Sequence, residues 1–451
     1  MNTRIATSLS RRSFLKAAGA LGVAGSVGLA SCAPATKKVT LNVKLPVITM
    51  SAVVDPDVSH SFDWLQKAGD AFTKDYKDYD VTLKFEQFEY TDETAVLIGT
   101  KDTPNACDML YEGYFNMGTY IHNGNVVPLD DIISDSLKSD IDDAIWAMGQ
   151  ADGKNYEMPY LALQNVLVFN KDMFNAAGLE KYTAAADDIQ NWTITQWEEV
   201  LDTLAANLPG GSYPLMMYGK NDQGDTHIMT FIRSHGCDFF DNDGNFVVNT
   251  PEGIAALDWL QKGVDRGWYP PNPAALELAD NGELFANQQL AILLTNSAFL
   301  PSYLDKGLNI GMVNFPHSTT PQGICTSFVT GFQVWDNGDA DKVAVAKAFV
   351  KYIMETSPWN EYSAGSLPVS HSVAQKYAND VLYMDSFSNN AANVVDFTHN
   401  DPNWRGVRDV FWPNIRDLLS GTVTPEQCAA NIDSTCNAAV KEGRDKSTLH
   451  A

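Results

Sequence analysis

Basic residues are scarce in this chain of 451 residues: 31 Lys and Arg stand against 56 Asp and Glu, a formal net charge of −25. This balance excludes nucleic acid as a partner, because phosphate binding requires a basic face. Six cysteines in a chain of this length are too few for a disulfide scaffold. Charged residues make up 19% and hydrophobic residues 45%, which excludes a largely disordered chain. The length predicts two or three domains.

The N-terminal residues predict an export signal. Arg11 and Arg12 precede an apolar, Gly- and Ala-rich stretch at 17–30, which is too short for a permanent membrane span. The paired arginines resemble a twin-arginine export signal, and the alternative is the basic end of a general secretory signal. Residues 29–32 (LASC) resemble a bacterial lipobox, whose Cys32 is acylated and becomes the new N-terminus. Chance placement of this cysteine is the alternative.

Removal of the signal at residues 1–31 changes the charge and the cysteine count. The segment holds four basic residues and no acid, so the other 420 residues carry 27 basic against 56 acidic side chains, or −29. Residues 32–38 are then a lipidated tether. Five cysteines remain, so at least one is unpaired in a monomer. Cys428 and Cys436 lie eight residues apart in a predicted helix, about 12 Å along its axis, too far for a disulfide. The spacing matches no zinc site, and we expect no metal and no cofactor.

Strand and helix patterns alternate along the mature chain. Residues 40–45 and 81–85 alternate apolar and polar side chains, as half-buried strands do, and an amphipathic helix lies between them. Thr195 with Glu198 forms a capping box, and Thr250 and Thr424 each precede a proline at the first helical position. The alternation predicts an α/β fold with a mostly parallel sheet.

Several short motifs, in order along the chain, resemble one protein family. They are DMLYE at 108–112, GNVVPLD at 124–130, GKNYEMPY at 153–160, VFNKDMF at 168–174, FANQQLAI at 285–292 and KAFVKYI at 347–353. Together they resemble the extracellular solute-binding proteins of ABC importers, in the carbohydrate-binding family that includes maltose-binding protein. The resemblance covers nearly all of residues 40–440, although Gln288 stands where that family usually has glycine.

The resemblance implies a periplasmic-binding-protein type II fold, with two discontinuous α/β lobes and a ligand cleft and hinge between them. Ligand binding closes the lobes, and the closed form docks on the transporter. The crossings between lobes are expected near residues 160–163, 295–297 and 335–342. The N-terminal lobe is expected to comprise residues 39–160 and 297–340, and the C-terminal lobe residues 161–296 and 341–451.

Sugars present apolar ring faces edged by hydroxyl groups, so a sugar site combines aromatic rings with polar side chains. Glu112, Phe115 and Asn116 follow a predicted strand, at the edge where a parallel sheet delivers its loops to a ligand. The resemblance places them in the family's cleft loop, and a solvated loop is the alternative. His60 and Asp63 match the polar contacts of the family's first cleft loop. The alternative for Asp63 is helix capping.

Further candidates come from the second half of the chain. Phe299 stands where the family has an aromatic residue that stacks on sugar, with a core position as the alternative. Trp412 and Arg416 match the family's C-terminal F-W-x-x-x-R element, so Trp412 is the first choice for stacking and Arg416 a supporting donor. Trp404, on the preceding loop, is a weaker candidate. Gly331 is a place where backbone is expected to approach the ligand.

Thr226 and His227 occupy a loop where the family often places an aromatic residue. Their presence puts a stacking contact there in doubt, although His227 is able to donate a hydrogen bond.

The sequence thus predicts a receptor that captures a carbohydrate, an oligosaccharide by expectation, and delivers it to the permease subunits of an ABC importer. We expect a monomer without catalytic residues, held at the outer face of the bacterial cytoplasmic membrane only through acylated Cys32. One alternative is a binding protein of the same fold for a polyamine, a metal complex or a peptide. A less favoured one is a secreted carbohydrate-active enzyme, because 56 acidic residues leave a catalytic carboxylate pair open.

Overall fold

The structure, a computed structural model, describes residues 36–48, 50, 53–184, 188–220, 224–318 and 323–449. The residues from Lys38 onward form one compact unit. The predicted export signal and Cys32 lie outside the described residues. No helix in the described ranges is long and apolar enough to cross a membrane.

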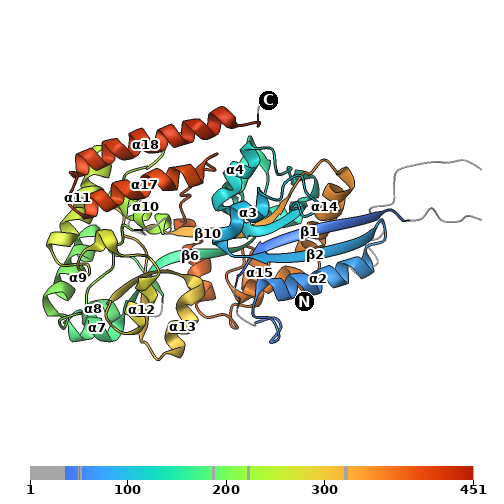
Figure 1. Cartoon of the computed structure of the whole chain (residues 1–451). Coiled ribbons are helices and arrows are strands. Elements are labelled where there is room, and N and C mark those ends of the chain that lie inside the picture. The colour runs from blue at the N-terminus through green and yellow to red at the C-terminus, as the bar shows by residue number, and fades with distance from the viewer. Residues whose placement is uncertain are drawn as a thin grey trace, which may run out of the picture. The chain divides into compact units, whose positions relative to one another are not determined.

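An eight-stranded sheet organises this unit (Figure 1). Its order is β2-β1-β3-β10-β6-β9-β7, and β8 also pairs with β6. β1 pairs in parallel with β2 and β3, but every pair that involves β6 or β10 is antiparallel. The sheet is therefore mixed rather than mostly parallel. The strands are β1 Lys38–Pro46, β2 Asp80–Phe88, β3 Met109–Gly113, β6 Met158–Asn170, β7 Ile189–Gln190, β8 Ile292–Asn296, β9 Ile310–Val313 and β10 Thr326–Val334, and a separate hairpin pairs β4 Gln150–Ala151 with β5 Lys154–Asn155.

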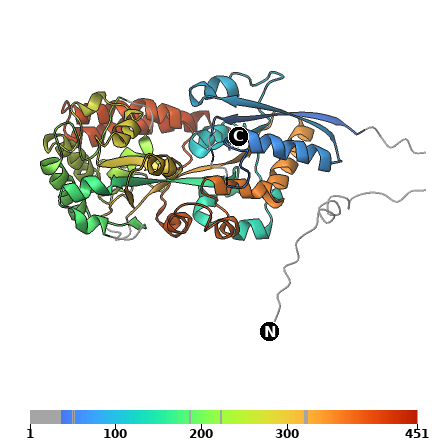
Figure 2. The same cartoon turned by 90° about the horizontal axis from the view of Figure 1, so that it is seen from below.

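Helices cover the sheet and complete the predicted α/β fold. Near β1, α2 and α14 pack against each other (Figures 1 and 2), and α17 lies along α18. The helices are α2 Ser61–Asp75, α3 Glu93–Leu97, α4 Met117–His122, α5 Asp135–Ser139, α6 Asp143–Met148, α7 Lys171–Ala176, α8 Glu180–Thr183, α9 Ile194–Asn207, α10 Asp225–Arg233, α11 Pro251–Asp265, α12 Asp280–Ala286, α13 Leu300–Asp305, α14 Ala340–Glu355, α15 His371–Lys376, α16 Met384–Asn390, α17 Trp404–Leu419 and α18 Pro425–Lys446.

Local capping explains where several helices begin. Thr250 accepts from the Gly253 amide at 3.1 Å, and Thr424 forms a capping box, so both predicted starts are confirmed. The predicted start at Thr195 is wrong, because Thr193 forms the capping box with Gln196. The first turn of α9 therefore begins two residues earlier than predicted.

The long strands β6 and β10 connect the two ends of the sheet. The first half of β6 pairs with β10, with Leu163 opposite Phe328, and its last residues pair with β8 and β9. β10 continues along β3 on its other edge. A third segment joins them at Val394, which forms a parallel bridge with Cys325. Three stretches of backbone thus pass side by side through the middle of the molecule, and the predicted crossing at residues 160–163 lies in one of them.

Two contacts bear on the predicted lobe boundaries, which stay a prediction. α14 packs against β1 and α2, although the sequence assigned residues 341–451 to the C-terminal lobe. β9 pairs with Leu167–Asn170 of β6, although residues 297–340 were assigned to the N-terminal lobe.

Candidate functional site

Three phenylalanine rings from distant parts of the sequence meet beside β6 and β10, and we call them the aromatic cluster. Phe115 lies in the short turn after β3, Phe328 lies on β10, and Phe397 comes from the segment between α16 and α17. The ring centroid of Phe115 is 4.8 Å from that of Phe328 and 5.3 Å from that of Phe397. Phe397 is fully buried, whereas Phe115 and Phe328 keep part of their surface accessible.

A buried ion pair lies against the aromatic cluster. Arg408 on α17 holds Asp225, the first residue of α10, with Nη2 2.8 Å from Oδ1. The guanidinium also lies over the ring of Phe115, 5.8 Å from its centroid. Trp404 Nε1 donates to the other carboxylate oxygen of Asp225 at 3.1 Å. Asp225 is 1% exposed, so these donors are what stabilises its charge, and loss of one of them is expected to be costly.

A second buried carboxylate, that of Glu93, is bonded by Asn116, the residue that follows Phe115. Asn116 Nδ2 donates to both oxygens of Glu93, each at 2.8 Å, and the Tyr120 hydroxyl donates to Oε1. Burial raises the pKa of Glu93, and the hydrogen bonds from Tyr120 and Asn116 and the charge of Arg408 oppose that rise. Asp225 thus pairs with Arg408, which lies over Phe115, and Glu93 is bonded by Asn116, which follows Phe115 in the sequence. This is the combination that the sequence analysis associated with sugar binding.

The structure places His227, Thr226 and Trp412 in a neighbouring buried group. His227 Nδ1 is 2.9 Å from the Tyr218 hydroxyl, and the Tyr218 ring centroid is 5.7 Å from that of Trp412. Burial lowers the pKa of His227 to about 4, so the ring is neutral at pH 7. Among the described residues, His227 Nε2, Thr226 Oγ1 and Trp412 Nε1 have no hydrogen-bond partner. Because buried polar atoms are normally bonded, these three are exceptions in this structure.

Other predicted site residues lie apart from the aromatic cluster. His60 and Asp63 form the capping box of α2, the alternative that the sequence left open. Arg416 is exposed and pairs with the neighbouring Asp417 at 3.1 Å. Phe299 is 53% exposed at the start of α13, not in the core. Their role in binding stays a prediction.

Gly331 is explained by strand packing. A Cβ at this position would lie 2.2 Å from the carbonyl oxygen of Met158, so β10 and β6 approach closely only with glycine there. The register between the two strands shifts at Thr330 and Gly331. A further contact of this backbone with ligand stays a prediction.

Sequence reasoning missed five residues that build the candidate site: Glu93, Asp225, Phe328, Phe397 and Arg408. The sequence offered one indication of Phe328: this residue lies in the same strand as Gly331, directly after Thr326 and Ser327. Asp225 and Arg408 are separated by 183 positions, and nothing local marks them as partners.

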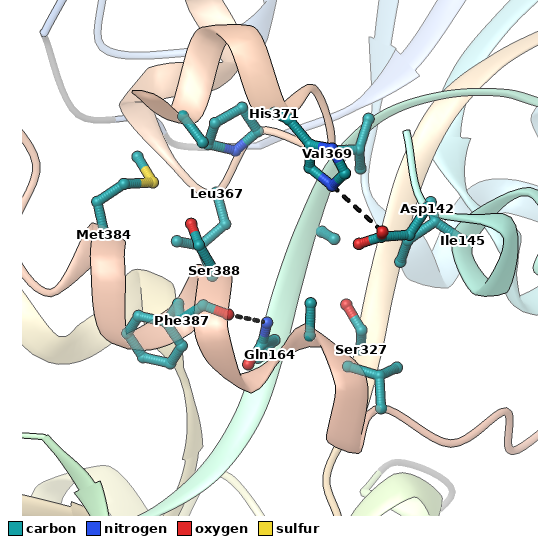
Figure 3. A pocket seen from close by; sticks show the side chains of 15 residues that line it. Asp142, Ile145, Gln164, Ser327, Leu367, Val369, His371, Met384, Phe387 and Ser388 are labelled. Atoms are coloured by element: carbon teal, nitrogen blue, oxygen red, sulfur yellow. Dashed lines mark hydrogen bonds and ion pairs between the residues drawn. The ribbon is translucent and has the colours of Figure 1, made fainter. Parts of the chain in front are cut away.

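A cavity of about 60 Å³ lies on the crossing strands, lined by Ala162 and Gln164 of β6 and Ser327 of β10 (Figure 3). Because side chains alternate along a strand, Ser327 faces away from neighbouring Phe328, which puts this cavity and the aromatic cluster on opposite sides of β10. Gln164 donates to the Phe387 carbonyl at 2.8 Å, and His371 lies 3.2 Å from Asp142 (Figure 3). The cavity has about the volume of two water molecules and a largely apolar lining, so it is small for an oligosaccharide.

Within the described ranges, no group of three or more His, Cys, Asp or Glu side chains is arranged to hold a metal ion.

Comparison with known proteins identifies the family. The pattern of the bacterial extracellular solute-binding proteins matches residues 57–357, and that of the twin-arginine translocation signal matches residues 8–28. This chain is a bacterial extracellular solute-binding protein. The family is one of binding proteins, and the signal indicates export. A binding protein of Brucella abortus is 23% identical over 442 residues, covering 94% of this chain and 98% of the relative.

Solved structures show the same fold as this binding protein. The cyclic alpha-maltosyl-1,6-maltose binding protein of Arthrobacter globiformis aligns with a TM-score of 0.70 and 19% identity, over 90% of this chain and 100% of that one. The GacH receptor of Streptomyces glaucescens, solved unliganded and with acarbose, gives a TM-score of 0.69 and 16% identity, over 90% and 99%. The predicted type II periplasmic-binding fold is confirmed.

The binding protein also buries two unusual carboxyl groups on the sheet. Glu112 of β3 stands opposite Gly331, and Glu157 receives a weak hydrogen bond from Gln333 at 3.4 Å. One oxygen of each carboxyl group has no partner among the described residues. Burial raises the pKa of both groups well above the ordinary value of 4.5. Glu112 is therefore a buried group on the sheet, and a role in ligand contact stays a prediction.

We predict that Glu157→Gln stabilises the binding protein increasingly as the pH rises. Between the ordinary pKa of 4.5 and the raised one, the folded protein keeps a proton that the unfolded chain releases, so stability falls with rising pH. Glutamine removes this dependence and keeps the side-chain shape. Calorimetry should show a Tm advantage that grows between about pH 5 and pH 8, to roughly 2 °C or more. The exposed Glu89→Gln is the control and should show no such trend. A variant that is less stable than wild type at pH 8 would contradict the prediction.

Proposed function

We propose that this binding protein captures a carbohydrate, an oligosaccharide, between its lobes and delivers it to the permease subunits of an ABC importer. The observation that carries the proposal is the aromatic cluster together with two hydrogen-bonding pairs at Phe115, Asp225 with Arg408 and Glu93 with Asn116. Flat apolar rings edged by hydrogen-bonding groups match the faces and edges of a pyranose. The site joins residues from both ends of the sheet, so closure around a sugar would bring both walls to it.

The names of similar proteins support a sugar as the ligand. Besides the two structures described above, the diacetylchitobiose binding protein of Streptomyces coelicolor is 22% identical over 404 residues, covering 84% of this chain and 87% of that protein. The maltose/maltodextrin-binding domain of Bdellovibrio bacteriovorus, bound to maltotriose, aligns with a TM-score of 0.66 and 16% identity over 89% of this chain and all of that one. These ligands are all carbohydrates but differ in linkage, so the specific sugar is left to experiment.

The cellular setting of the proposal is the outer face of the cytoplasmic membrane. The lipobox-like residues before Cys32 support acylation of that cysteine after export, which would keep a monomeric receptor near its permease. Mass spectrometry of the protein from membranes tests this step, since an acylated N-terminal cysteine should be found at position 32.

A binding screen tests the proposed function. Thermal unfolding of the purified protein is measured in the presence of a panel of malto-, chito- and cyclic oligosaccharides. Spermidine and iron chelates are tested in the same way as non-sugar ligands. Because a ligand that binds only the folded state stabilises it, a sugar at about 100 times its Kd should raise stability by about 2.7 kcal/mol. A response to spermidine or a chelate and to no sugar would overturn the proposal. New reducing ends during incubation with oligosaccharide would show an enzyme instead.

Substitutions of two aromatic residues test where the sugar binds. Phe115→Ala removes the ring beside Arg408, and Trp412→Ala removes the ring that the sequence favoured for stacking. We expect each folded variant to bind the best sugar more weakly by about 2–4 kcal/mol, the range for loss of a buried aromatic anchor. Phe62→Ala, which removes a partly buried ring on α2 next to Phe85, is the control and should bind normally. Unchanged calorimetric affinity in either folded variant would remove that ring from the site.

A further inference from the structure

Five cysteines in the described part of the chain are buried and unpaired: Cys107, Cys237, Cys325, Cys428 and Cys436. Four of them have no measurable exposure, and Cys237 is 4% exposed. The sequence required only one to be unpaired, so the structure goes further than that expectation. An exported protein with five free thiols and no disulfide among its described cysteines is unusual, because extracellular compartments favour disulfides.

Each thiol fits into the packing around it. Cys107 donates to the Met109 carbonyl at 3.3 Å, Cys428 to the Asn414 carbonyl at 3.5 Å, and Asn390 donates to Cys325 at 3.4 Å. Burial raises the pKa of Cys325 and of Cys428 to about 12. Because the thiolate is the reactive form, these protonated and buried thiols are inert in the folded protein.

The same thiols are exposed when the chain is unfolded. Outside the cytoplasm, a thiolate of the chain attacks the disulfide of a thiol oxidase and forms a mixed disulfide. A second thiolate then displaces the oxidase, so the chain gains one S–S bond and the oxidase becomes a dithiol. Two electrons pass from the chain to the oxidase. None of these pairs is present in the fold, where the five described thiols are free and buried, so a chain that forms one of them would not reach this packing.

This thiol chemistry bears on the export signal, which contains the paired arginines. Residues 8–28 match the twin-arginine translocation signal, which distinguishes the route from general secretion. We propose that the five thiols must be buried before the chain meets an extracellular oxidant, and that the binding protein therefore folds in the reducing cytoplasm and is exported folded through its twin-arginine signal. The burial of the thiols is then the structural reason for the choice of export route.

Exchange of the signal tests the proposal. One strain exports the protein with its own residues 1–31, and a second exports it with a general secretory lipoprotein signal that ends at the same Cys32. Thiols are alkylated before and after denaturation and counted by mass. With its own signal, the exported protein should show five thiols that react only after denaturation. With the general signal, we expect fewer than five thiols per chain and a several-fold lower yield of folded protein.

Two matched controls separate thiol chemistry from other effects of the signal. Cys→Ala at all five positions should restore the yield through the general signal, and removal of the extracellular thiol oxidase should restore it for the wild-type chain without any core substitution. The second control covers the case in which the alanine variant fails to fold. Five free thiols and an equal yield through the general signal would overturn the proposal. So would a low yield that neither control restores, or a disulfide in protein exported by its own signal.

Discussion

The antiparallel pairing of β6 with β10 is the constraint on which the rest of the structure depends. Leu163 opposite Phe328 fixes the register of these strands, and Gly331 allows their backbones to approach closely. β3 is attached to one end of this pair, while β8 and β9 are attached to the other. A change of one residue in register would move Phe328 to the opposite side and separate it from Phe115. The aromatic cluster therefore exists only because these strands pair as they do.

Acidic side chains have different roles on the surface and in the interior of this protein. Most of the acidic excess lies on the surface, where it favours solubility, and it does not describe the site. Beside the aromatic cluster, Asp225 is buried and held by Arg408 and Trp404, so its geometry is fixed before a ligand arrives. Glu112 and Glu157 are buried without a charged partner at hydrogen-bonding distance, and they lower stability at neutral pH instead. A site whose charged groups are already paired or hydrogen-bonded suits an uncharged ligand such as a sugar.

Local features of the sequence predicted local structure well. The strands at 40–45 and 81–85 and the helix starts at Thr250 and Thr424 depend on neighbouring residues, and the structure confirms them. The predicted start at Thr195 is wrong because Thr193 caps the helix two residues earlier and forms the capping box with Gln196, a pattern that is equally local.

The site was harder to predict than the fold. Phe115 and Trp404 were candidates because they lie near recognisable motifs, and the structure places both at the aromatic cluster or its ion pair. Phe397 and Arg408 lie in segments without such a motif, and their partners are far away in sequence. His60 and Asp63 form a helix cap, the alternative that the sequence left open for Asp63, and their role in ligand binding stays a prediction. Contacts between distant segments are set by the sheet order, which periodicity alone does not reveal.

Hydrogen–deuterium exchange with and without the best-binding sugar tests the central claim most directly. If the sugar binds at the aromatic cluster, amides of residues 112–116, 225–233 and 404–408 should exchange more slowly in its presence, because closure buries them from both sides. Peptides around the opposite cavity, such as 384–391, should change less. Protection confined to that cavity, or sugar binding without protection at Phe115 and Arg408, would contradict the account.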